Sequence, residues 1–490
     1  MTFVIPSDLM VSVSGVRGRL GEGLTPEVVA RFAAAFGAYL GDRAPRSRSG
    51  QVPPSSAVAD GVASAERSAG HRPRVVLARD SRTSGPMFTA AVTAGLQSVG
   101  CDILSAGLVP TPTALYAIRH HAADGGIVVT ASHNPVEWNA LKFASADGMF
   151  LDAQEAPRMR AYVSDRPIPR AGWDGLGSVT VDEGAVRRHL DAVLAIPFLD
   201  VDALRRRRFR VALDCVRGAG AALLPALLEG LGCEVIGIHL EPDGRFPRPP
   251  EPVAENLGEL ERLVRDSGAD IGMATDPDAD RLALVSDAGR AIGEDLTLTL
   301  ATMLVLRHRT GPVVTNLSTS RVLEDVVRDA GGTLERAPVG EINVARAMER
   351  AGAVIGGEGN GGVILPDVHL TRDSAIAAAL VLQLMLEVER PIGELVGGLP
   401  PYTIVKDKLP RDAGSLEAAF GVLESSLDAA AADRQDGLRL DWPETKRWLH
   451  LRASGTEPIL RIIAEAPTAS EARQLVDRAR AALAGAGGGP

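Results

Sequence analysis

Apolar residues along this chain fall into short runs that alternate with longer amphipathic stretches. One run, 127–129, ends at small and turn-forming residues that are closed by Pro135. A short apolar run bounded in this way is typical of a buried strand, and a proline cannot continue its hydrogen-bonded ladder. The pattern therefore predicts a core strand followed by a loop that presents the hydroxyl of Ser132. Open α/β sheets bind their ligands at such strand ends.

One plan of strand, turn, helix, glycine and strand occurs three times. The first strands of the three copies are predicted at 74–78, 210–214 and 312–316. The second strands are predicted at 101–104, 234–238 and 333–336. Because the copies are spaced at roughly domain length, they indicate three similar α/β domains.

The pattern changes after about Pro391. Strands are predicted at 403–408, 448–452 and 459–464, and helices at 416–431 and 470–483. This order is typical of a smaller α+β domain with an antiparallel sheet. The predicted fold is therefore of the α/β class, with three α/β domains and a last α+β domain at 1–173, 174–292, 293–390 and 391–490.

Composition is consistent with a soluble globular protein of several domains. The chain has 490 residues, of which 45% are hydrophobic and 23% are charged, and this length exceeds what one core supports. A net charge of −10 disfavours a general nucleic-acid role. No uninterrupted apolar stretch is long enough to span a bilayer. The segment 43–72 is rich in Pro, Ser, Ala, Gly and Arg without a sustained period, which predicts a flexible surface insertion.

The three cysteines are Cys101, Cys215 and Cys233, and they are not spaced as metal-binding pairs. They lie in or beside apolar segments, so we expect buried free thiols in a reducing compartment. Because the N-terminus also lacks a basic segment followed by a long apolar core, the predicted location is the cytoplasm.

Three aspartates at alternate positions, Asp276, Asp278 and Asp280, lie between two strand-like runs. Carboxylates so placed can converge on one hard cation, and Mg²⁺ favours oxygen ligands with open positions. An EF-hand would need a glycine where Arg281 stands and helices on both sides, so we reject it. The alternative is three solvated turn aspartates, although clustered like charges cost free energy unless a cation sits among them.

Two later loops have residues suited to a sugar and to a phosphate. In the glycine-rich segment 356–362 the backbone can approach a ligand closely, and Glu358 and Asn360 can exchange hydrogen bonds with sugar hydroxyls. Two arginines, two hydroxyls and a glycine turn predict an oxyanion site formed by Arg452, Ser454, Gly455, Thr456 and Arg461.

Two further cations are candidates for phosphate contact. Arg17 is expected in a glycine-flanked loop, and its planar guanidinium suits phosphate, although an ordinary strand-end turn is the alternative. Lys142 follows the Ser132 loop, where it could stabilise charge or transfer a proton beside a phosphorylated serine. A surface lysine is the alternative for this residue. Ser-His hydrolase chemistry fits worse, because His133 is adjacent in sequence to Ser132 and the G-x-S-x-G elbow is missing.

Three loops, in this order, resemble those of the α-D-phosphohexomutase superfamily. They are Thr130-Ala131-Ser132-His133-Asn134-Pro135, Asp276-Pro277-Asp278-Ala279-Asp280-Arg281 and Arg452-Ala453-Ser454-Gly455-Thr456-Glu457-Pro458. The resemblance covers nearly the whole chain apart from the insertion. It implies four domains around a central active-site cleft, each contributing one loop. We expect a monomer or a homodimer that binds a hexose phosphate.

The resemblance also implies roles for individual residues. Ser132 would be the phosphoserine and would share Mg²⁺ with Asp276, Asp278 and Asp280. The remaining catalytic candidates are Arg17, Lys142 and His133. The substrate-binding candidates are Arg281, Glu358, Asn360, Arg452, Ser454, Gly455, Thr456 and Arg461. The segment 79–82 resembles the superfamily's supporting segment near the phosphoserine.

The implied reaction is a reversible phosphoryl transfer from phospho-Ser132 to a hexose monophosphate, through a hexose 1,6-bisphosphate that turns over before the other phosphate returns. Two departures matter. Many members end the sugar loop with Ser-Gly-His, whereas this chain has Asn360-Gly361-Gly362, so proton transfer by that histidine is absent. His369 is nearby in sequence but is not expected to replace it. Ala140 stands where glycine is usual.

The glycine-rich segment and the segment 338–344 look most like those of archaeal-type and related bacterial phosphoglucosamine mutases. The predicted reaction is therefore the interconversion of glucosamine 6-phosphate and glucosamine 1-phosphate. A dual-specificity phosphoglucomutase/phosphomannomutase is the alternative. A catalytically silent sugar-phosphate-binding protein and a metal-dependent phosphatase are alternatives of other classes, against which Ser132, the three aspartates and Lys142 argue.

Overall fold

The computed structural model describes residues 3–13, 15–43, 72–410, 416–453 and 459–486. These residues form two compact units, one of Met1–His189 with Asp243–Arg245 and one of Leu190–Pro242 with Phe246–Pro490. The predicted insertion at 43–72 lies outside the described residues except for its two ends. None of the helices in the described part combines the length and apolar character needed to cross a membrane.

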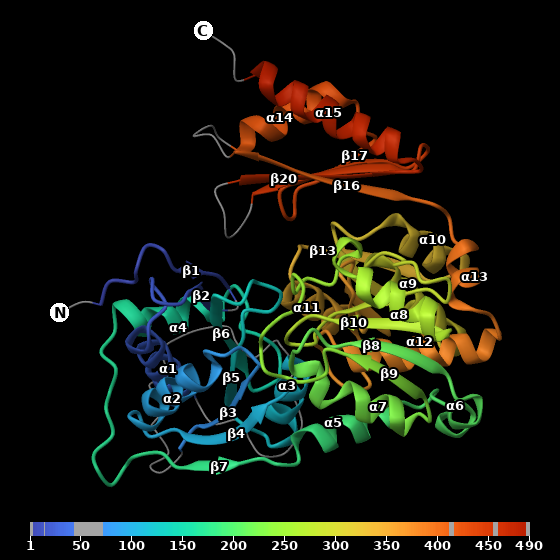
Figure 1. Ribbon diagram of the computed structural model, residues 1–490. Coiled ribbons are helices and arrows are strands. Elements are labelled where there is room, and N and C mark those ends of the chain that lie inside the picture. Colours follow the sequence, from blue (N-terminus) through green and yellow to red (C-terminus); the bar gives the residue numbers. More distant parts are fainter. Residues whose placement is uncertain (1–2, 14, 44–71, 411–415, 454–458, 487–490) are drawn as a thin grey trace. The chain divides into compact units, whose positions relative to one another are not determined.

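The first unit is built on a seven-stranded sheet (Figure 1). Its strands, in spatial order, are β1 (Met10–Val11), β2 (Gly15–Arg19), β6 (Trp138–Ser145), β5 (Gly125–Val129), β3 (Arg74–Arg79), β4 (Asp102–Leu108) and β7 (Val179–Val181). Strands β5, β3, β4 and β7 are parallel, whereas β6 is antiparallel to both β5 and β2. The helices of this unit are α1 (Pro26–Gly41), α2 (Gly85–Gln97), α3 (Thr111–His120) and α4 (Glu155–Ser164).

Helix α1 illustrates how the sequence sets an element. The side chain of Thr25 caps its N-terminus by accepting a hydrogen bond from the backbone N–H of Val28, and Pro26 occupies the first turn, where a missing N–H costs nothing. Phe32 and Phe36 are fully buried, and their rings lie 6.5 and 5.1 Å from that of Phe143 in β6. The helix therefore packs on the sheet through an aromatic stripe.

Two four-stranded sheets of the second unit share one topology. The second sheet has the order β9 (Glu234–Ile238), β8 (Arg210–Asp214), β10 (Ile271–Thr275) and β11 (Leu282–Val285). The third sheet has the order β13 (Thr333–Ala337), β12 (Pro312–Asn316), β14 (Ile355–Glu358) and β15 (Gly362–Ile364). In each, three strands are parallel and the last is antiparallel, as in β4-β3-β5-β6 of the first unit. The predicted threefold repeat is confirmed.

Helices surround these sheets. They are α5 (Ala185–Leu194), α6 (Val201–Arg207), α7 (Leu224–Gly230), α8 (Gly258–Ser267), α9 (Asp295–His308), α10 (Arg321–Asp329), α11 (Glu341–Ala351), α12 (Ser374–Val388) and α13 (Ile392–Gly397), with 3₁₀ turns η2 (Ala219–Ala222) and η3 (Ala254–Asn256). Helix α12 is buried at every position from Ser374 to Met385, as expected for a helix that is apolar all round.

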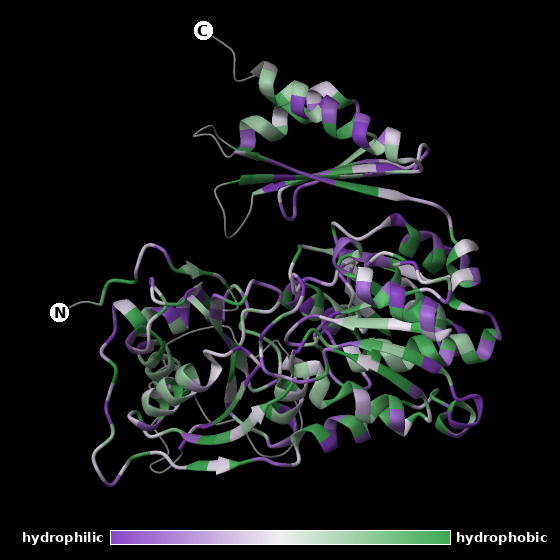
Figure 2. Ribbon diagram, in the orientation of Figure 1, coloured by the Kyte–Doolittle hydropathy of each residue, from purple (hydrophilic) through white to green (hydrophobic). Residues whose placement is uncertain are grey.

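The fourth sheet is antiparallel throughout, which confirms the predicted change of class. Its order is β16 (Thr403–Pro410), β20 (Ile459–Ala466), β19 (Arg447–Ala453), β18 (Leu438–Trp442) and β17 (Ala431–Asp433). Helices α14 (Leu416–Leu427) and α15 (Ala469–Ala486) cover one face of it (Figure 1). Figure 2 shows hydrophobic and hydrophilic residues side by side along these two helices, the pattern of helices that pack through one face.

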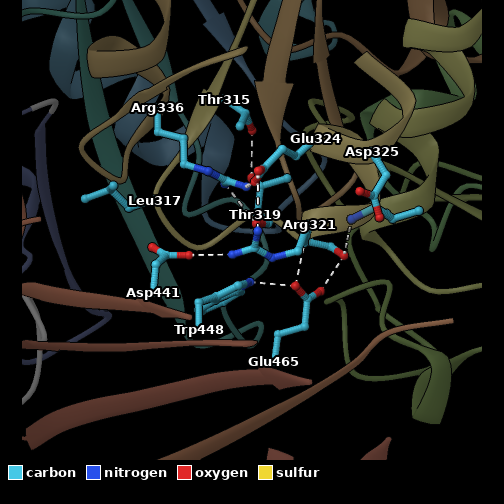
Figure 3. A network of polar contacts seen from close by, with 12 residues as sticks. Thr315, Leu317, Thr319, Arg321, Glu324, Asp325, Arg336, Asp441, Trp448 and Glu465 are labelled. Carbon is cyan, nitrogen blue, oxygen red and sulfur yellow. Dashed lines mark hydrogen bonds and ion pairs between the residues drawn. The ribbon is translucent and has the colours of Figure 1, made fainter. Parts of the chain in front are cut away.

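The other face of the fourth sheet is polar and contacts the loop before helix α10 (Figure 3). The carboxylate of Glu465 accepts hydrogen bonds from the backbone N–H of Arg321 (2.9 Å), from Trp448 Nε1 (2.6 Å) and from the hydroxyl of Ser320. The guanidinium of Arg321 donates to Asp441 Oδ1 at 2.6 Å. Burial raises the pKa of Glu465 although these donors oppose it. The third and fourth sheets are therefore joined by charged and hydrogen-bonding groups.

Several sequence predictions were wrong in detail. Arg17 lies within strand β2, because Gly15 lets that strand approach β6 so closely that a Cβ would lie 2.0 Å from a backbone oxygen. The helix predicted at 416–431 ends at Leu427, since Asp428 adopts a left-handed backbone (φ 47°) and the alanines beyond it pair as β17. Residues 356–358, predicted as loop, belong to β14.

Other predictions held or remain open. Cys101 and Cys215 are buried and Cys233 is half-buried, all as free thiols. Burial raises the pKa of Cys101 and of Cys233 to about 12, so these thiols stay protonated at neutral pH. The boundaries of the four predicted domains stay predictions. Each sheet lies within one predicted domain, except that β7 falls just past the first boundary.

Candidate functional site

The loop that follows β5 holds the hydroxyl of Ser132 in a constrained setting. Ser132 is 4% exposed and has a left-handed backbone (φ 49°), an uncommon conformation for a residue with a Cβ. Its N–H donates to Thr130 Oγ1 (3.0 Å), which in turn donates to Asp80 Oδ2 (2.6 Å). Ser132 Oγ lies 3.3 Å from His133 Nδ1. The nucleophile candidate is thus fixed by a short relay of hydrogen bonds.

Arg82 fixes the backbone of the same loop by hydrogen bonds. Its guanidinium is fully buried, and Nε pairs with Asp80 Oδ2 at 3.1 Å. The two terminal nitrogens donate to four backbone carbonyls, those of Ser132 (2.7 Å), Asn134 (2.6 Å), Pro135 (2.6 Å) and Trp138 (3.0 Å). A buried arginine satisfied in this way fixes the path of the backbone it touches. The segment 79–82, which the sequence indicated as a support, occupies that position.

Arg17 and Lys142 come from the two strands nearest to β5 on one side. Arg17 Nη1 donates to Asn134 Oδ1 at 2.5 Å, so the Ser132 loop and β2 are joined. Lys142 in β6 pairs with Val128 of β5, is 8% exposed, and places Nζ 5.3 Å from the ring centroid of Phe150. A lysine this buried is not the surface lysine that was the alternative.

The turn between β10 and β11 contains the predicted acidic triplet. Asp276, Asp278 and Asp280 are fully buried, and one ligand oxygen from each lies within 4.8 Å of the others. Burial, and then the charges of Asp280 and Asp278, raise the pKa of Asp276 well above its ordinary value. Such an arrangement favours a bound cation. The alternative of three solvated turn aspartates is therefore excluded by their burial.

The donor atoms fit a hard divalent cation. Within the described chain, Asp280 Oδ1 is buried and accepts no hydrogen bond, and Arg281 Nε lies 3.8 Å from it. An oxygen left in this state costs free energy unless a ligand takes it up. Three carboxylates with room for further ligands match Mg²⁺.

Glu358, the last residue of β14, lies at the centre of a hydrogen-bonded cluster. Its Oε1 accepts from Asn316 Nδ2 (2.8 Å) and from the backbone N–H of Gly340 (2.9 Å). Its Oε2 accepts from Arg372 Nη1 (2.6 Å) and from Asn360 Nδ2 (3.4 Å). Burial would raise the pKa of Glu358, but the charge of Arg372 and these donors outweigh it, so the pKa falls. Glu358 is therefore an anion with a fixed orientation.

Sequence reasoning missed Arg372 and Glu341. Arg372 also pairs with Asp280, and Glu341 accepts from the backbone N–H of Arg372 at 3.0 Å. A signal existed: Arg372 is a lone cation directly before the apolar helix α12, where a charge needs a partner. Nη1 of Arg281, which stays a predicted substrate ligand, lies 3.4 Å from Glu251 Oε1.

His369, which is not expected to replace the missing histidine, contacts the N-cap of helix α12. It is buried, and its Nε2 lies 2.9 Å from Asp373 Oδ2. Asp373 caps helix α12 by accepting from the backbone N–H groups of Ala375 and Ile376. The imidazole therefore supports a helix terminus.

The predicted oxyanion site is described in part. Ser454, Gly455 and Thr456 lie outside the described residues. Arg452 of β19 and Arg461 of β20 are directly opposite each other, and Lys408 of β16 is opposite Arg461 on its other side. Like charges opposed across strands destabilise a sheet. Arg452 Nε lies 3.2 Å from Asp436 Oδ2, and a row of three cations on one face of the sheet favours an anionic ligand. Lys408 is a residue that the sequence did not single out.

The predicted residues thus form two groups. In the first unit, Ser132, His133 and Arg17 lie around one loop, with Lys142 on the neighbouring strand. In the second unit, Asp280 and Glu358 are joined through Arg372, and the cationic row lies on the fourth sheet.

Comparison with known families matches most of the chain from residue 54 to residue 482. Four consecutive family models, described as phosphoglucomutase/phosphomannomutase alpha/beta/alpha domains I, II and III and the C-terminal domain, match residues 54–166, 187–289, 293–402 and 404–482.

Individual relatives agree. A protein of Methanopyrus kandleri named "Probable phosphoglucosamine mutase" is 36% identical over 468 residues, which cover 95% of both chains. One of Thermococcus kodakarensis named "Phosphoglucomutase/phosphomannomutase" is 36% identical over 467 residues, 94% of this chain and 96% of that one. The crystal structure of a phosphoglucomutase/phosphomannomutase family protein from Burkholderia thailandensis superposes with a TM-score of 0.80 at 25% identity, covering 98% of each chain.

Proposed function

The chain belongs to the phosphoglucomutase/phosphomannomutase family of enzymes, and from this premise we propose that it interconverts glucosamine 6-phosphate and glucosamine 1-phosphate through a phosphoserine at Ser132. The proposal rests mainly on Ser132, which is buried and has a left-handed backbone conformation. It lies in a loop in which Arg82 donates hydrogen bonds to four backbone carbonyls. Relatives named phosphoglucosamine mutase support the choice of sugar. Dual phosphoglucomutase/phosphomannomutase activity is the second candidate, favoured by the name of the second relative above.

In the proposed reaction, phospho-Ser132 transfers its phosphoryl group to a free hydroxyl of a hexose monophosphate. The bond between phosphorus and Ser132 Oγ breaks, a bond to the sugar oxygen forms, and the hydroxyl proton passes to a base. The product is a hexose 1,6-bisphosphate, and return of its other phosphate to Ser132 regenerates the enzyme. Lys142 and His133 are the candidates for proton transfer, and Arg17 is the candidate for phosphate contact.

Other residues of the chain bind and orient. Asp276, Asp278 and Asp280 would hold one Mg²⁺, which supplies charge neutralisation for phosphoryl transfer when it is bound. Glu358 presents a fixed carboxylate for sugar hydroxyls, together with Asn360. The phosphate that does not react would be bound by Arg452 and Arg461 with Ser454, Gly455 and Thr456.

The proposal is tested by mass and by turnover. The intact wild-type protein should carry a phosphoryl adduct that is absent in Ser132→Ala. We expect kcat/KM to be highest for glucosamine 1-phosphate when glucosamine, glucose, mannose and N-acetylglucosamine 1-phosphates are compared with a hexose 1,6-bisphosphate activator. A much higher value for glucose 1-phosphate would overturn the choice of sugar. Release of free phosphate without isomerisation would instead indicate a phosphatase.

A further inference from the structure

Arg372 joins two loops that are far apart in sequence. Its side chain is 8% exposed, and its two terminal nitrogens point to different carboxylates. Nη2 donates to Asp280 Oδ2 in the turn after β10, and Nη1 donates to Glu358 Oε2 at 2.6 Å at the end of β14. One guanidinium therefore sets the orientation of a candidate metal ligand and of a candidate sugar ligand together.

The backbone of Arg372 is also fixed. Its N–H donates to Glu341 Oε1 at 3.0 Å, and the hydroxyl of Thr371 donates to the same oxygen. Glu341 Oε2 lies 3.5 Å from Arg372 Nε. Asp373, the next residue, is the N-cap of helix α12. Because both ends of the side chain are held, the guanidinium has little freedom to move away from Asp280.

The path of this side chain depends on Gly362. A Cβ built on Gly362 would lie 2.2 Å from Arg372 Cδ and 2.8 Å from Arg372 Cγ, distances that no side chain tolerates. Arg372 thus passes through the space in which a side chain at position 362 would begin.

The contact with Asp280 restricts how that carboxylate can bind a metal. Since Oδ2 already accepts a hydrogen bond from Arg372, Oδ1 is the more available oxygen, and in the described chain it accepts no hydrogen bond. Mg²⁺ prefers single oxygens at nearly octahedral positions, whereas Ca²⁺ accepts both oxygens of one carboxylate. Holding one oxygen therefore favours the smaller ion.

We propose that Arg372 is a positioning residue that keeps Asp280 as a one-oxygen ligand, so favouring Mg²⁺ over Ca²⁺, and that it ties this metal site to Glu358 by occupying the space left by Gly362. The link to the sugar rests on the proposed function. The effect on the metal does not, because metal binding can be measured without turnover.

The first test measures binding of Mg²⁺ and of Ca²⁺ to the full-length protein by calorimetry. Arg372→Met should weaken Mg²⁺ binding about 10- to 100-fold, the range typical of partners that orient a metal ligand. Ca²⁺ binding should weaken less, so that the preference for Mg²⁺ shrinks. Arg372→Lys keeps the charge but cannot reach both carboxylates as a fork, so it should restore only part of the preference. The matched control is Arg309→Met, which removes an arginine paired with Asp367 on the same unit.

The second test is a double-mutant cycle. Gly362→Ala should weaken Mg²⁺ binding in the wild-type background but not in Arg372→Met, because the guanidinium that the alanine would displace from Asp280 is then already absent. Gly311→Ala is the steric control, since its Cβ would lie 2.4 Å from Val354 Cγ1 without touching Arg372. Unchanged Mg²⁺ affinity in Arg372→Met, or an equal loss from Gly362→Ala in both backgrounds, would overturn the proposal.

Turnover then separates the two claims. If the proposed function holds, Gly362→Ala and Arg372→Lys should raise KM for the sugar phosphate at saturating Mg²⁺, because Glu358 loses its orientation, with a smaller change in kcat. Loss of metal preference without any mutase activity in the wild type would sustain the role of Arg372 and overturn only the proposed function.

Discussion

The Ser132 loop and the Asp276–Arg281 loop occupy the same place in two copies of one topology, and they are stabilised in opposite ways. Each connects the third strand of its copy to the antiparallel fourth, and each has a non-glycine residue with a left-handed backbone, Ser132 (φ 49°) and Ala279 (φ 53°). In the first loop, Arg82 donates to backbone carbonyls. In the second, carboxylates are buried together, and Arg372 engages one of them.

This difference shows what each loop needs from a ligand. The Ser132 loop has its buried carbonyls satisfied by the chain itself, so it is preorganised before any substrate binds. The acidic loop brings three carboxylates together beside Arg281 and Arg372, an arrangement that favours a bound cation. One backbone plan is thus stabilised either through its carbonyls or through its carboxylates, depending on where the arginine donates.

Removing Arg82 should have the largest effect. Arg82→Met leaves four carbonyls and Asp80 without their buried donor, and loss of one partner of a buried charged pair typically costs about 3–5 kcal/mol. We expect the free energy of unfolding, from urea denaturation, to fall by that amount, and hydrogen exchange to accelerate at 130–138. Arg434→Met, which removes an exposed ion pair, should change stability by less than about 1 kcal/mol. A similar small change for Arg82→Met would show that the loop holds its own shape.

Removing one carboxylate from the acidic loop should stabilise the protein in the absence of Mg²⁺ and make it the less stable of the two proteins in the presence of Mg²⁺. Asp278→Asn relieves like-charge repulsion among buried groups, so in EDTA the variant should be more stable than the wild type, on the order of 1 kcal/mol. With Mg²⁺ the order should reverse, because a ligand is lost and Mg²⁺ affinity falls at least about 100-fold. Thermal denaturation with and without Mg²⁺ measures both. Equal responses of the two proteins to Mg²⁺ would place the cation elsewhere.

How much of this followed from sequence differs between the two loops. The acidic triplet, its flanking strands and the serine turn were predicted, because a buried strand ending in polar residues is a local pattern. Arg372 and Lys408 were not, since their roles arise from pairings across 92 residues in sequence and between adjacent strands. The glycines at 356–358 were read as a loop, although in β14 they allow close packing against β15 and helix α11. Alanines past Leu427 favoured helix by propensity, but strand pairing decided their structure.

The equivalent loop in the third copy of the repeat connects β14 to β15, and a carboxylate beside it should make the free energy of unfolding depend on pH. Asp295 lies beside it: a Cβ on Gly359 would lie 2.0 Å from Asp295 Oδ1, which accepts from the N–H of Ser320. Burial raises the pKa of Asp295 to about 7, from 3.8. The protonated form therefore contributes stability that is complete below pH 3.8 and is lost as the pH rises to about 7, by roughly 1.4 kcal/mol per pH unit.

Asp295→Asn should remove this dependence. Between pH 5 and pH 7 the free energy of unfolding of the wild type should fall relative to that of the variant, and at pH 8 the variant should be the more stable. Urea denaturation at several pH values measures the difference. Asp329→Asn, at an exposed position on α10, should leave the pH dependence unchanged. Parallel curves for wild type and Asp295→Asn would mean that the carboxyl is ionised in the folded protein throughout.

The smallest effect concerns the left-handed backbone that the first two loops share. Ser132→Ala and Ser132→Gly both remove the hydroxyl, so neither should carry a phosphoryl group. They differ only in whether the residue that adopts φ 49° has a Cβ. A Cβ in this region costs roughly 1–2 kcal/mol, partly offset because glycine gains more freedom in the unfolded chain. We therefore expect Ser132→Gly to be more stable than Ser132→Ala by about 1 kcal/mol in urea.

At Ala279, by contrast, Gly removes a fully buried methyl worth about 0.8 kcal/mol, so Ala279→Gly should be nearly neutral. If Ser132→Gly and Ala279→Gly change the free energy of unfolding by the same amount, the left-handed backbone alone determines the effect. The preorganisation of the Ser132 loop then involves no further strain.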